Sequence, residues 1–242
     1  MKKKKLFSGT ELKIIATVLM VIDHFAAIVL QAYFNKTGQN QNAQIIVDAV
    51  RLIGRVSYPL FVFLTVEGFL HTKDVFKYMQ TMLGFALFSE VPYDLAWFNT
   101  PFTLERQNVL FTLLGGIVCM YFIKKVEESE KVSDSMRFVY TVLIGAAGFM
   151  AGYLLKLDFY GMGILAIVLM YYFRKDRILQ GLWGNAPLIA LSTDQLFGLL
   201  AMIFISKYSG ERGKLKWKYF FYIFYPVHLL ILFGVVCLIK NN

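Results

Sequence analysis

Cysteine and acidic residues are scarce in this chain of 242 residues. Its 2 cysteines, Cys119 and Cys237, both fall inside hydrophobic segments, and the sequence has no Cys-x-x-Cys pair and no Cys/His spacing of a metal site. We therefore expect the two thiols to act as small apolar side chains, without a disulfide and without a metal. Internal repeats and low-complexity tracts are also absent from the sequence, which favours a single domain over residues 1–242.

Apolar side chains, by contrast, make up 57% of the residues and occur in blocks, together with 23 phenylalanines and 14 tyrosines. This composition excludes an ordinary soluble domain and is typical of a polytopic membrane protein in a lipid bilayer. A net charge of +9 is compatible with nucleic-acid binding, but the charges lie in short loops between the hydrophobic blocks. Membrane topology explains that distribution better, so we expect no nucleic-acid partner.

The hydrophobic pattern predicts an all-α, polytopic integral membrane protein with about nine transmembrane helices. The expected spans are residues 11–34, 45–71, 76–98, 107–124, 137–155, 159–173, 178–191, 193–206 and 219–239. Spans six to eight are short for a bilayer of about 30 Å, which favours a split or tilted arrangement, and Pro187 predicts a kink. The first apolar run is longer than a signal-peptide core and has no Ala-x-Ala site after it, so we expect an uncleaved first span.

The basic residues are distributed asymmetrically along these nine spans. If the N-terminus is cytoplasmic, most of the 25 lysines and arginines, including Lys2 to Lys5, lie on the cytoplasmic side. The remaining basic residues lie outside or in the outer half of the membrane, and they are Lys36, Arg51, Arg55, Arg106, Lys156 and Lys240. This bias predicts a cytoplasmic N-terminus in a multi-pass protein of a bacterial-type cytoplasmic membrane.

Lys13 and His24 are the most informative pair in the sequence. They are eleven residues apart in the first span, so a helix brings them to within about 20° of the same face, with a rise of about 16 Å. Lys13 then lies at the membrane edge and His24 near the middle of the bilayer. Ionisable groups at that depth usually face a cavity or a partner and mark function. An imidazole near the middle of the bilayer, with a lysine closer to the cytoplasmic surface, fits a catalytic base that an anionic donor reaches from the cytosol.

Other polar residues are expected at matching depths. Glu90 in the third span and His228 in the ninth lie at a height similar to that of His24, which suggests one shared cavity. The second span carries Arg51, Arg55 and Glu67, and Asp23 is a candidate partner for its arginines on depth alone. Structural ion pairing explains Asp23, Arg55 and Glu67 about as well as chemistry does.

Several ordered motifs resemble the TraX family over most of the chain. They include the Leu-Lys start of the first span and the segments at residues 54–61, 67–69, 89–94, 108–113, 210–213 and 220–229. TraX proteins are associated with acetylation of a conjugative pilin at its N-terminus. The stretches 157–161 and 208–210 depart from the family pattern.

A weaker resemblance extends to the wider transmembrane acyltransferases, whose first helix carries Arg-x10-His. Lys13-x10-His24 is similar, with lysine in place of the cation, and Glu67-Gly68-Phe69 stands where those enzymes have Ser-Gly-Phe. The resemblance implies acetyl-CoA as donor, with no metal. Depth and charge, together with this resemblance, give two groups of site residues. The catalytic candidates are His24, Asp23, Glu90 and His228, and the donor-binding candidates are Lys13, Arg55, Glu67, Lys73 and Lys77.

The sequence therefore predicts a membrane-embedded acetyltransferase in which His24 acts as general base or carries the acetyl group covalently. The acceptor is an exported protein amine or a glycan hydroxyl or amine, reached from the outer side. Two alternatives stay open. One is a small-solute transporter or flippase with a proton-coupled relay of buried charges. The other is an assembly factor without chemistry, whose charges serve helix packing.

Overall fold

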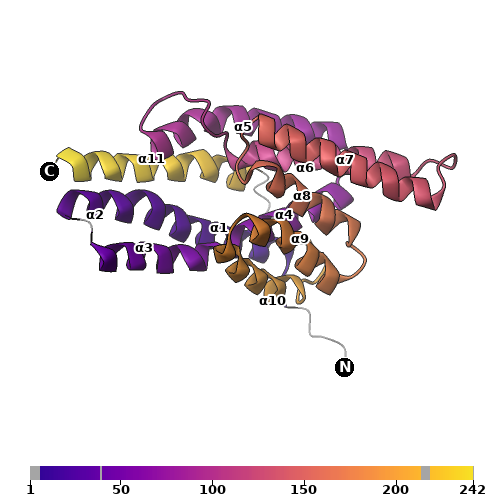
Figure 1. Cartoon of the computed structure of the whole chain (residues 1–242), viewed down its shortest axis with the longest axis horizontal. Helices are drawn as coiled ribbons and strands as arrows, with labels where there is room; N and C mark the ends of the chain where they lie inside the picture. The colour runs from indigo at the N-terminus through magenta and orange to yellow at the C-terminus, as the bar shows by residue number, and fades with distance from the viewer. Residues whose placement is uncertain (1–5, 39, 214–218, 242) are drawn as a thin grey trace. The chain divides into compact units, whose positions relative to one another are not determined.

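The computed structural model describes residues 6–38, 40–213 and 219–241. Within these ranges the chain is helical, with two isolated β-bridges and no strand (Figure 1). The all-α prediction is therefore confirmed. Lys2 to Lys5, which contributed to the predicted orientation, lie outside the described residues.

Five helical segments of the described chain are long and apolar enough to cross a membrane, judged by length and composition. They are Gly9–Thr37, Gln41–His71, Val109–Glu127, Asp134–Leu154 and Phe220–Asn241. Two shorter apolar segments, Tyr160–Tyr172 and Thr193–Ile205, accompany them. Each of the nine predicted spans contains a helix, and crossing of the membrane by all nine stays a prediction.

The first predicted span is one continuous helix with a change of winding. It consists of α1 (Gly9–His24), the π-helix η1 (Phe25–Leu30) and α2 (Gln31–Thr37). A capping box starts it, because the Ser8 side chain accepts from the backbone N–H of Glu11 while the Glu11 side chain accepts from that of Ser8. π-Helical turns are rare and frequently occur at functional sites, and this one begins directly after His24.

The second predicted span is divided, which the hydrophobic pattern did not indicate. A turn at Arg55 and Val56 separates α3 (Gln41–Gly54) from α4 (Ser57–His71). Pro59 accounts for the break, because it has no N–H to donate to the carbonyl of Arg55 and its ring crowds that carbonyl. The predicted helix 193–206 also differs, since it begins as the 3₁₀-helix η2 (Thr193–Leu200) and becomes α-helical only in α10 (Ala201–Ile205).

The chain forms two compact units, each assembled from separate segments. The first unit comprises Met1–Phe61, Phe88–Thr103 and Asp194–Asn242. In it, the helix α1–η1–α2 packs against α3 on one side and against α11 (Phe220–Asn241) on the other (Figure 1). Lys36 Nζ donates to the Ile239 carbonyl at 2.6 Å and so ties α2 to the end of α11.

The second unit comprises Val62–Leu87 and Leu104–Thr193. Its buried centre is α8 (Tyr160–Tyr172), which packs against α6 (Val109–Glu127), α7 (Asp134–Leu154) and α9 (Arg177–Leu191).

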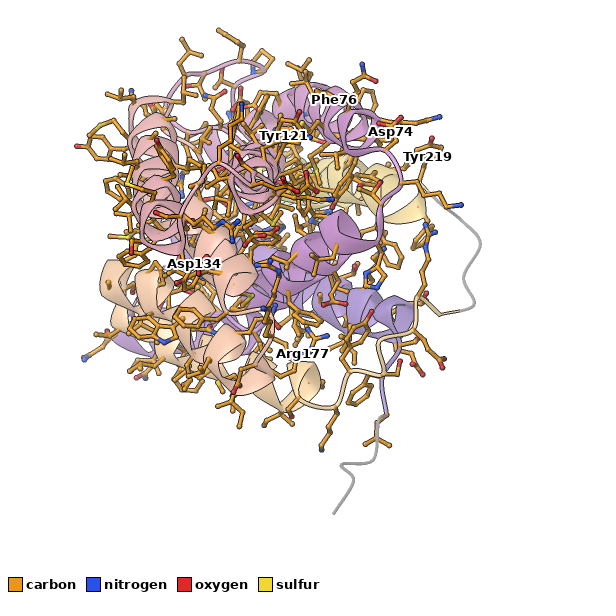
Figure 2. All side chains as sticks on the ribbon, turned by 90° about the vertical axis from the view of Figure 1, so that its right-hand side faces the viewer. Asp74, Phe76, Tyr121, Asp134, Arg177 and Tyr219 are labelled. Carbon is orange, nitrogen blue, oxygen red and sulfur yellow. The ribbon has the colours of Figure 1, made fainter. Side chains whose placement is uncertain are left out.

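Small residues and aromatic rings bring the helices of the second unit together. A side chain at Gly152 of α7 would meet the backbone of Gly161, so the two helices approach closely where both residues are small, as is common in membrane proteins. At the start of α5 (Val75–Phe98), the Phe76 ring lies 5.3 Å from that of Tyr121 in α6 (Figure 2). Helices α4 and α5 contribute residues to both units, so the division does not follow a linker, and the single domain over 1–242 stays a prediction.

Candidate active site

Helix α1 carries Lys13 and His24 on one face. Both residues lie within its α-helical part, so the geometry expected from their eleven-residue spacing applies without correction. The π-helical turn starts one residue later, at Phe25. His24 is therefore the last residue before the winding of the helix changes.

His24 contacts His228 of α11, the residue that depth matching had grouped with it. Nδ1 of His24 lies 2.8 Å from Nε2 of His228, and the two rings are within 10° of parallel. On its other side, Nδ1 of His228 lies 3.1 Å from the carbonyl oxygen of Phe224, one turn earlier in α11. The two imidazoles and this carbonyl form one hydrogen-bonded chain.

The Phe224 carbonyl fixes the direction of both hydrogen bonds, from His228 to Phe224 and from His24 to His228. A carbonyl oxygen only accepts, so Nδ1 of His228 carries its proton, and Nε2 of the neutral ring is left as an acceptor. Nδ1 of His24 must then donate to Nε2 of His228. In the neutral pair, the remaining lone pair of His24 is on Nε2. We assign Nε2 as the basic atom of this site.

Aromatic rings surround the imidazole pair. Trp97 of α5 meets the His24 ring edge-on, with 5.7 Å between ring centroids. Phe224 lies parallel to the His228 ring at 5.4 Å, and Tyr225 is tilted against it at 5.6 Å. His228 is 5% exposed, so its orientation is held by packing on several sides. Glu90 lies two helical turns before Trp97 on α5, and its participation in the site stays a prediction.

Asp23, next to His24, is the counterion of two arginines. Its Oδ1 lies 3.5 Å from Nε of Arg51 and 3.6 Å from Nη1 of Arg55, so the ion pair that depth matching suggested is present. The arginines are four residues apart on α3 and its C-terminal end, and thus on one face. In the described part of the chain, Asp23 is the one carboxylate within ion-pair distance of either guanidinium. The cluster therefore carries one more positive charge than negative.

Gly54 explains how Asp23 reaches this position. A Cβ added at Gly54 would overlap the side chain of Asp23, so α1 and α3 approach more closely here than any larger residue allows. The sequence signal for this contact was present in the Gly54-Arg55 motif. Its packing role follows only from the structure.

Lys13 is part of a second group of charges, at the start of α1. Its Nζ lies 5.7 Å from the centroid of the Phe221 ring, and the charge of Arg212 acts on it. The Arg212 carbonyl accepts from the N–H of Thr10 at 3.1 Å and from its hydroxyl at 3.1 Å. Within the described ranges, neither Lys13 nor Arg212 forms an ion pair with a carboxylate. None of the undescribed residues has a carboxylate side chain. Two unneutralised cations thus stand together.

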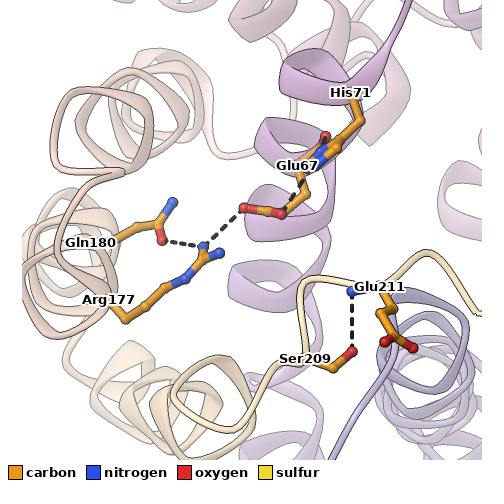
Figure 3. A network of polar contacts seen from close by, with 6 residues as sticks. All are labelled: Glu67, His71, Arg177, Gln180, Ser209 and Glu211. Atoms are coloured by element: carbon orange, nitrogen blue, oxygen red, sulfur yellow. Dashed lines mark hydrogen bonds and ion pairs between the residues drawn. The ribbon is translucent and has the colours of Figure 1, made fainter. Parts of the chain in front are cut away.

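Three of the donor-binding candidates belong to the second unit. Glu67 of α4 is 7% exposed and accepts from Arg177 Nη1 at 2.9 Å, and the same nitrogen donates to Gln180 (Figure 3). Lys73 lies in the connection between α4 and α5, and Lys77 is in the first turn of α5, where its N–H donates to Asp74. Because Glu67 is engaged by Arg177, its geometry is that of a structural ion pair.

Sequence reasoning did not single out Arg177, Trp97 or Arg212. Arg177 and Arg212 look like ordinary cytoplasmic cations in the sequence, and Trp97 like one more interfacial aromatic residue. The Gly210-Glu211-Arg212-Gly213 motif did carry a signal. Gly210 and Gly213 adopt positive φ angles of 82° and 88°, and this lets the loop fold back onto the start of α1. Figure 3 shows the loop, in which the Glu211 N–H donates to Ser209 Oγ.

Comparisons with known proteins identify the family. Residues 8–236 match the TraX protein family. The chain is also 28% identical to the "Probable fimbrial assembly protein FimC, serogroup H1" of Dichelobacter nodosus, over 93% of this chain and 94% of that protein. No solved structure matches. Because the family match covers nearly the whole sequence, the chain belongs to the TraX family.

Proposed function

We propose that this protein is a membrane-embedded acetyltransferase, which moves an acetyl group from cytosolic acetyl-CoA to an acceptor on the outer side of the membrane. The observation that carries the proposal is the hydrogen-bonded chain from the Phe224 carbonyl through His228 to His24. It leaves His24 with a basic Nε2 inside a predicted membrane span. A histidine held in one tautomer by a second residue is the usual arrangement of a general base.

The charges at the start of α1 support an anionic donor. CoA carries several phosphate charges, and Lys13 with Arg212 provides two cations that no carboxylate of the described chain neutralises. We propose that Lys13 contacts the donor phosphates, while the donor-binding role of Lys73 and Lys77, which belong to the second unit, stays a prediction of the sequence. Arg55 is engaged in an ion pair with Asp23, so we assign it a positioning role beside His24. Glu67 is paired with Arg177 within the second unit, and its donor-binding role stays a prediction of the sequence.

In the proposed reaction, His24 Nε2 removes the proton from the acceptor amine or hydroxyl as the acceptor attacks the thioester carbonyl carbon. The bond from that carbon to sulfur then breaks, and His24 returns the proton to the departing CoA thiolate. His228 keeps the lone pair on Nε2 throughout by accepting from Nδ1 of His24. The surplus positive charge of Arg51 and Arg55, beside His24, favours the negative oxygen that forms during the attack.

Family membership and the named relative support an acceptor connected with pili. FimC is described as a fimbrial assembly protein, and we infer that the acceptor here is the N-terminal amine of a pilin-like exported protein. A glycan hydroxyl or amine is the second acceptor class. We further propose nine membrane crossings, a cytoplasmic N-terminus and placement in a bacterial cytoplasmic membrane, in agreement with the distribution of basic residues.

The test is acetyl-CoA binding and turnover by the purified full-length chain in detergent. His24→Ala is expected to keep donor binding and to lose turnover by about 10²–10⁴-fold, the usual contribution of a general base. Lys13→Ala is expected to weaken donor binding by about tenfold, the scale of one hydrogen bond to a charged group.

Two matched variants control for general effects of losing these side chains. Phe138→Ala removes an exposed aromatic ring of α7, and Lys125→Ala removes an exposed lysine of α6. Both should leave binding and turnover unchanged. Folded wild-type protein that fails to bind acetyl-CoA would favour the transporter. An assembly factor without chemistry would lose abundance, rather than turnover alone, in His24→Ala.

A further inference from the structure

An apolar groove runs between α1 and α11 in the first unit. It encloses about 580 Å³ and is lined by residues of the two helices, namely Ile14, Thr17, Val18, Val21, Ile22, Phe220, Phe221 and Phe224. The one lining side chain with a polar atom is that of Thr17. Ile14 is 46% exposed and Val18 53%, so the groove is accessible from outside the unit. It offers an apolar ligand contacts but offers a polar ligand almost no hydrogen bonds.

The length of the groove matches one leaflet of a membrane. From Ile14 to Ile22 the axis of α1 rises by about 12 Å, whereas half of the hydrocarbon core is about 15 Å thick. One end of the groove lies beside Lys13, at the predicted membrane edge, and the other approaches the level of His24. A single acyl chain, extended along the helix, fits this length.

Positive charge stands at the edge end of the groove. Thr10, whose N–H and hydroxyl hold the Arg212 carbonyl, lies one turn before Ile14 on the same side of α1. Lys13 Nζ lies over the ring of Phe221, which lines the groove. Because neither cation pairs with a carboxylate of the described chain, an anionic group at this end would meet two free positive charges.

The groove adjoins the candidate active site, because Phe224, which lines it, also packs against His228, but most of its α1 lining lies on another side of the helix than His24. Relative to Lys13, the position of His24 is rotated by about 20° around α1, whereas those of Ile14 and Val21 are rotated by about 100° and 80°. The reactive face and the groove are thus neighbouring sides of the same helix. The groove is also a poor path for the pantetheine arm of CoA, because the two amides of that arm would lose their hydrogen bonds to water there.

We propose that the α1–α11 groove is a binding site for an anionic phospholipid, with one acyl chain between the helices and the phosphate at Arg212 and Lys13. The apolar lining selects a hydrocarbon chain, and the two cations select a negatively charged head group. Arginine is permanently charged and suits bidentate contacts with phosphate. The site shares Lys13 and Arg212 with the proposed donor site, so a lipid phosphate and CoA would compete there, but the binding of lipid is measured without acetyl transfer.

The experiment uses the full-length protein in vesicles that contain a photoreactive phospholipid with a diazirine in the acyl chain. One set carries it on phosphatidylglycerol and the other on phosphatidylcholine, in otherwise identical membranes, and cross-linked peptides are identified by mass spectrometry. Cross-links from phosphatidylglycerol are expected within residues 14–22 and 220–224. They should exceed those from phosphatidylcholine by about fivefold, the scale of one basic residue at an anionic surface.

Two variants test the two halves of the site. Val18→Trp fills the groove and should reduce the cross-links in both segments to background, while Val142→Trp, at an exposed position of α7, should not. Arg212→Gln lies in an exposed loop and should bring the yields from the two lipids to within about twofold of each other. It remains informative if Val18→Trp fails to fold.

Three results would overturn the proposal. They are equal yields from the two lipids in the wild type, cross-links confined to other segments, and a Val18→Cys variant that forms a disulfide-linked dimer, which would assign the groove to a second copy of the chain. The experiment measures lipid binding, so its result does not depend on whether the protein has acetyltransferase activity, and the two proposals can fail separately.

Discussion

Nδ1 of His24 lies 2.8 Å from Nε2 of His228, although 204 residues separate the two histidines in the chain. The contact joins the end of α1 to the middle of α11, and the Phe224 carbonyl decides which nitrogen of each ring carries a proton. The two hydrogen bonds engage both ring nitrogens of His228 and fix one tautomer for each ring. The arrangement gives His24 one defined basic atom, and this relationship can be tested independently of the acceptor.

Replacing His228 should separate hydrogen bonding from packing. In His228→Leu the acceptor for His24 Nδ1–H is lost, and we expect turnover of acetyl-CoA to fall by about 10–100-fold, a typical cost of losing the residue that orients a functional histidine. His228→Gln keeps an acceptor oxygen and should retain most of the activity. The measurements are turnover and its pH profile, beside acetyl-CoA affinity. Equal activity of the leucine and glutamine variants would contradict the assigned order of donors.

The Asp23 cluster predicts an effect on stability. Asp23→Asn keeps the shape of the side chain but leaves the guanidiniums of Arg51 and Arg55 without a counterion. Because the three side chains are 14–31% exposed, we expect a loss of about 1–3 kcal/mol, less than for a fully buried pair. The free energy of unfolding in detergent measures it.

A second substitution provides the check on this interpretation. Arg51→Gln in the Asp23→Asn background removes one of the two unpaired positive charges, which returns the cluster to its wild-type net charge, and should restore part of the stability. Asp134→Asn is the matched control, because the Asp134 side chain is 96% exposed and pairs with Arg137 at the surface. A loss of stability in the control as large as in Asp23→Asn would rule out a special role for the cluster.

Much of this architecture was readable from the sequence because hydrophobic blocks and buried charges each carry a strong physical signal. Block lengths predicted a helix in every expected span, and depth along α1 suggested Asp23 as partner of Arg51 and Arg55. The break at Arg55 and Val56 was missed because Pro59 is compatible with the first turn of a new helix as well as with a kink.

Contacts between distant segments were harder to predict. Depth matching brought His228 to the level of His24, but the angle of each helix about its axis decides whether two side chains touch. The π-helical turn after His24 has no recognised sequence signal in this segment. Arg177 is 110 residues from Glu67, so nothing local distinguished it from the other basic residues.

That pair provides a prediction about the second unit. Arg177→Gln leaves the Glu67 side chain, 8% exposed, with His71 at 3.9 Å as its remaining neighbour of opposite potential charge, and because Arg177 is itself 37% exposed we expect a loss of about 1–3 kcal/mol of unfolding free energy. The double variant Glu67→Gln/Arg177→Gln replaces both charges and should return to within about 1 kcal/mol of the wild type. If Glu67 positions helices, the double variant binds acetyl-CoA as the wild type does. A double variant that is stable but binds the donor poorly would return Glu67 to the donor site.

The number of membrane crossings can be decided by two cysteines. If α5 crosses the membrane, as the nine-span topology requires, Phe102 lies outside the cell and Glu130 in the cytoplasm. If only the five long apolar segments cross the membrane, α5 does not take the chain to the other side, so Phe102 lies in the cytoplasm and Glu130 outside the cell. Both side chains are exposed, Phe102 by 68% of its surface, so either site is accessible to a reagent.

We expect Phe102→Cys, in a chain whose Cys119 and Cys237 are replaced by alanine, to react with a membrane-impermeant maleimide on intact cells. Glu130→Cys should react only after the cells are permeabilised, which also serves as the control for reactivity. The physical reason is the charge around position 130, since Lys124, Lys125 and Lys131 favour the cytoplasmic side. The reverse pattern would leave α5 on one side of the membrane. Glu90 would then lose the bilayer depth that grouped it with His24, while the contact between His24 and His228 would be unaffected.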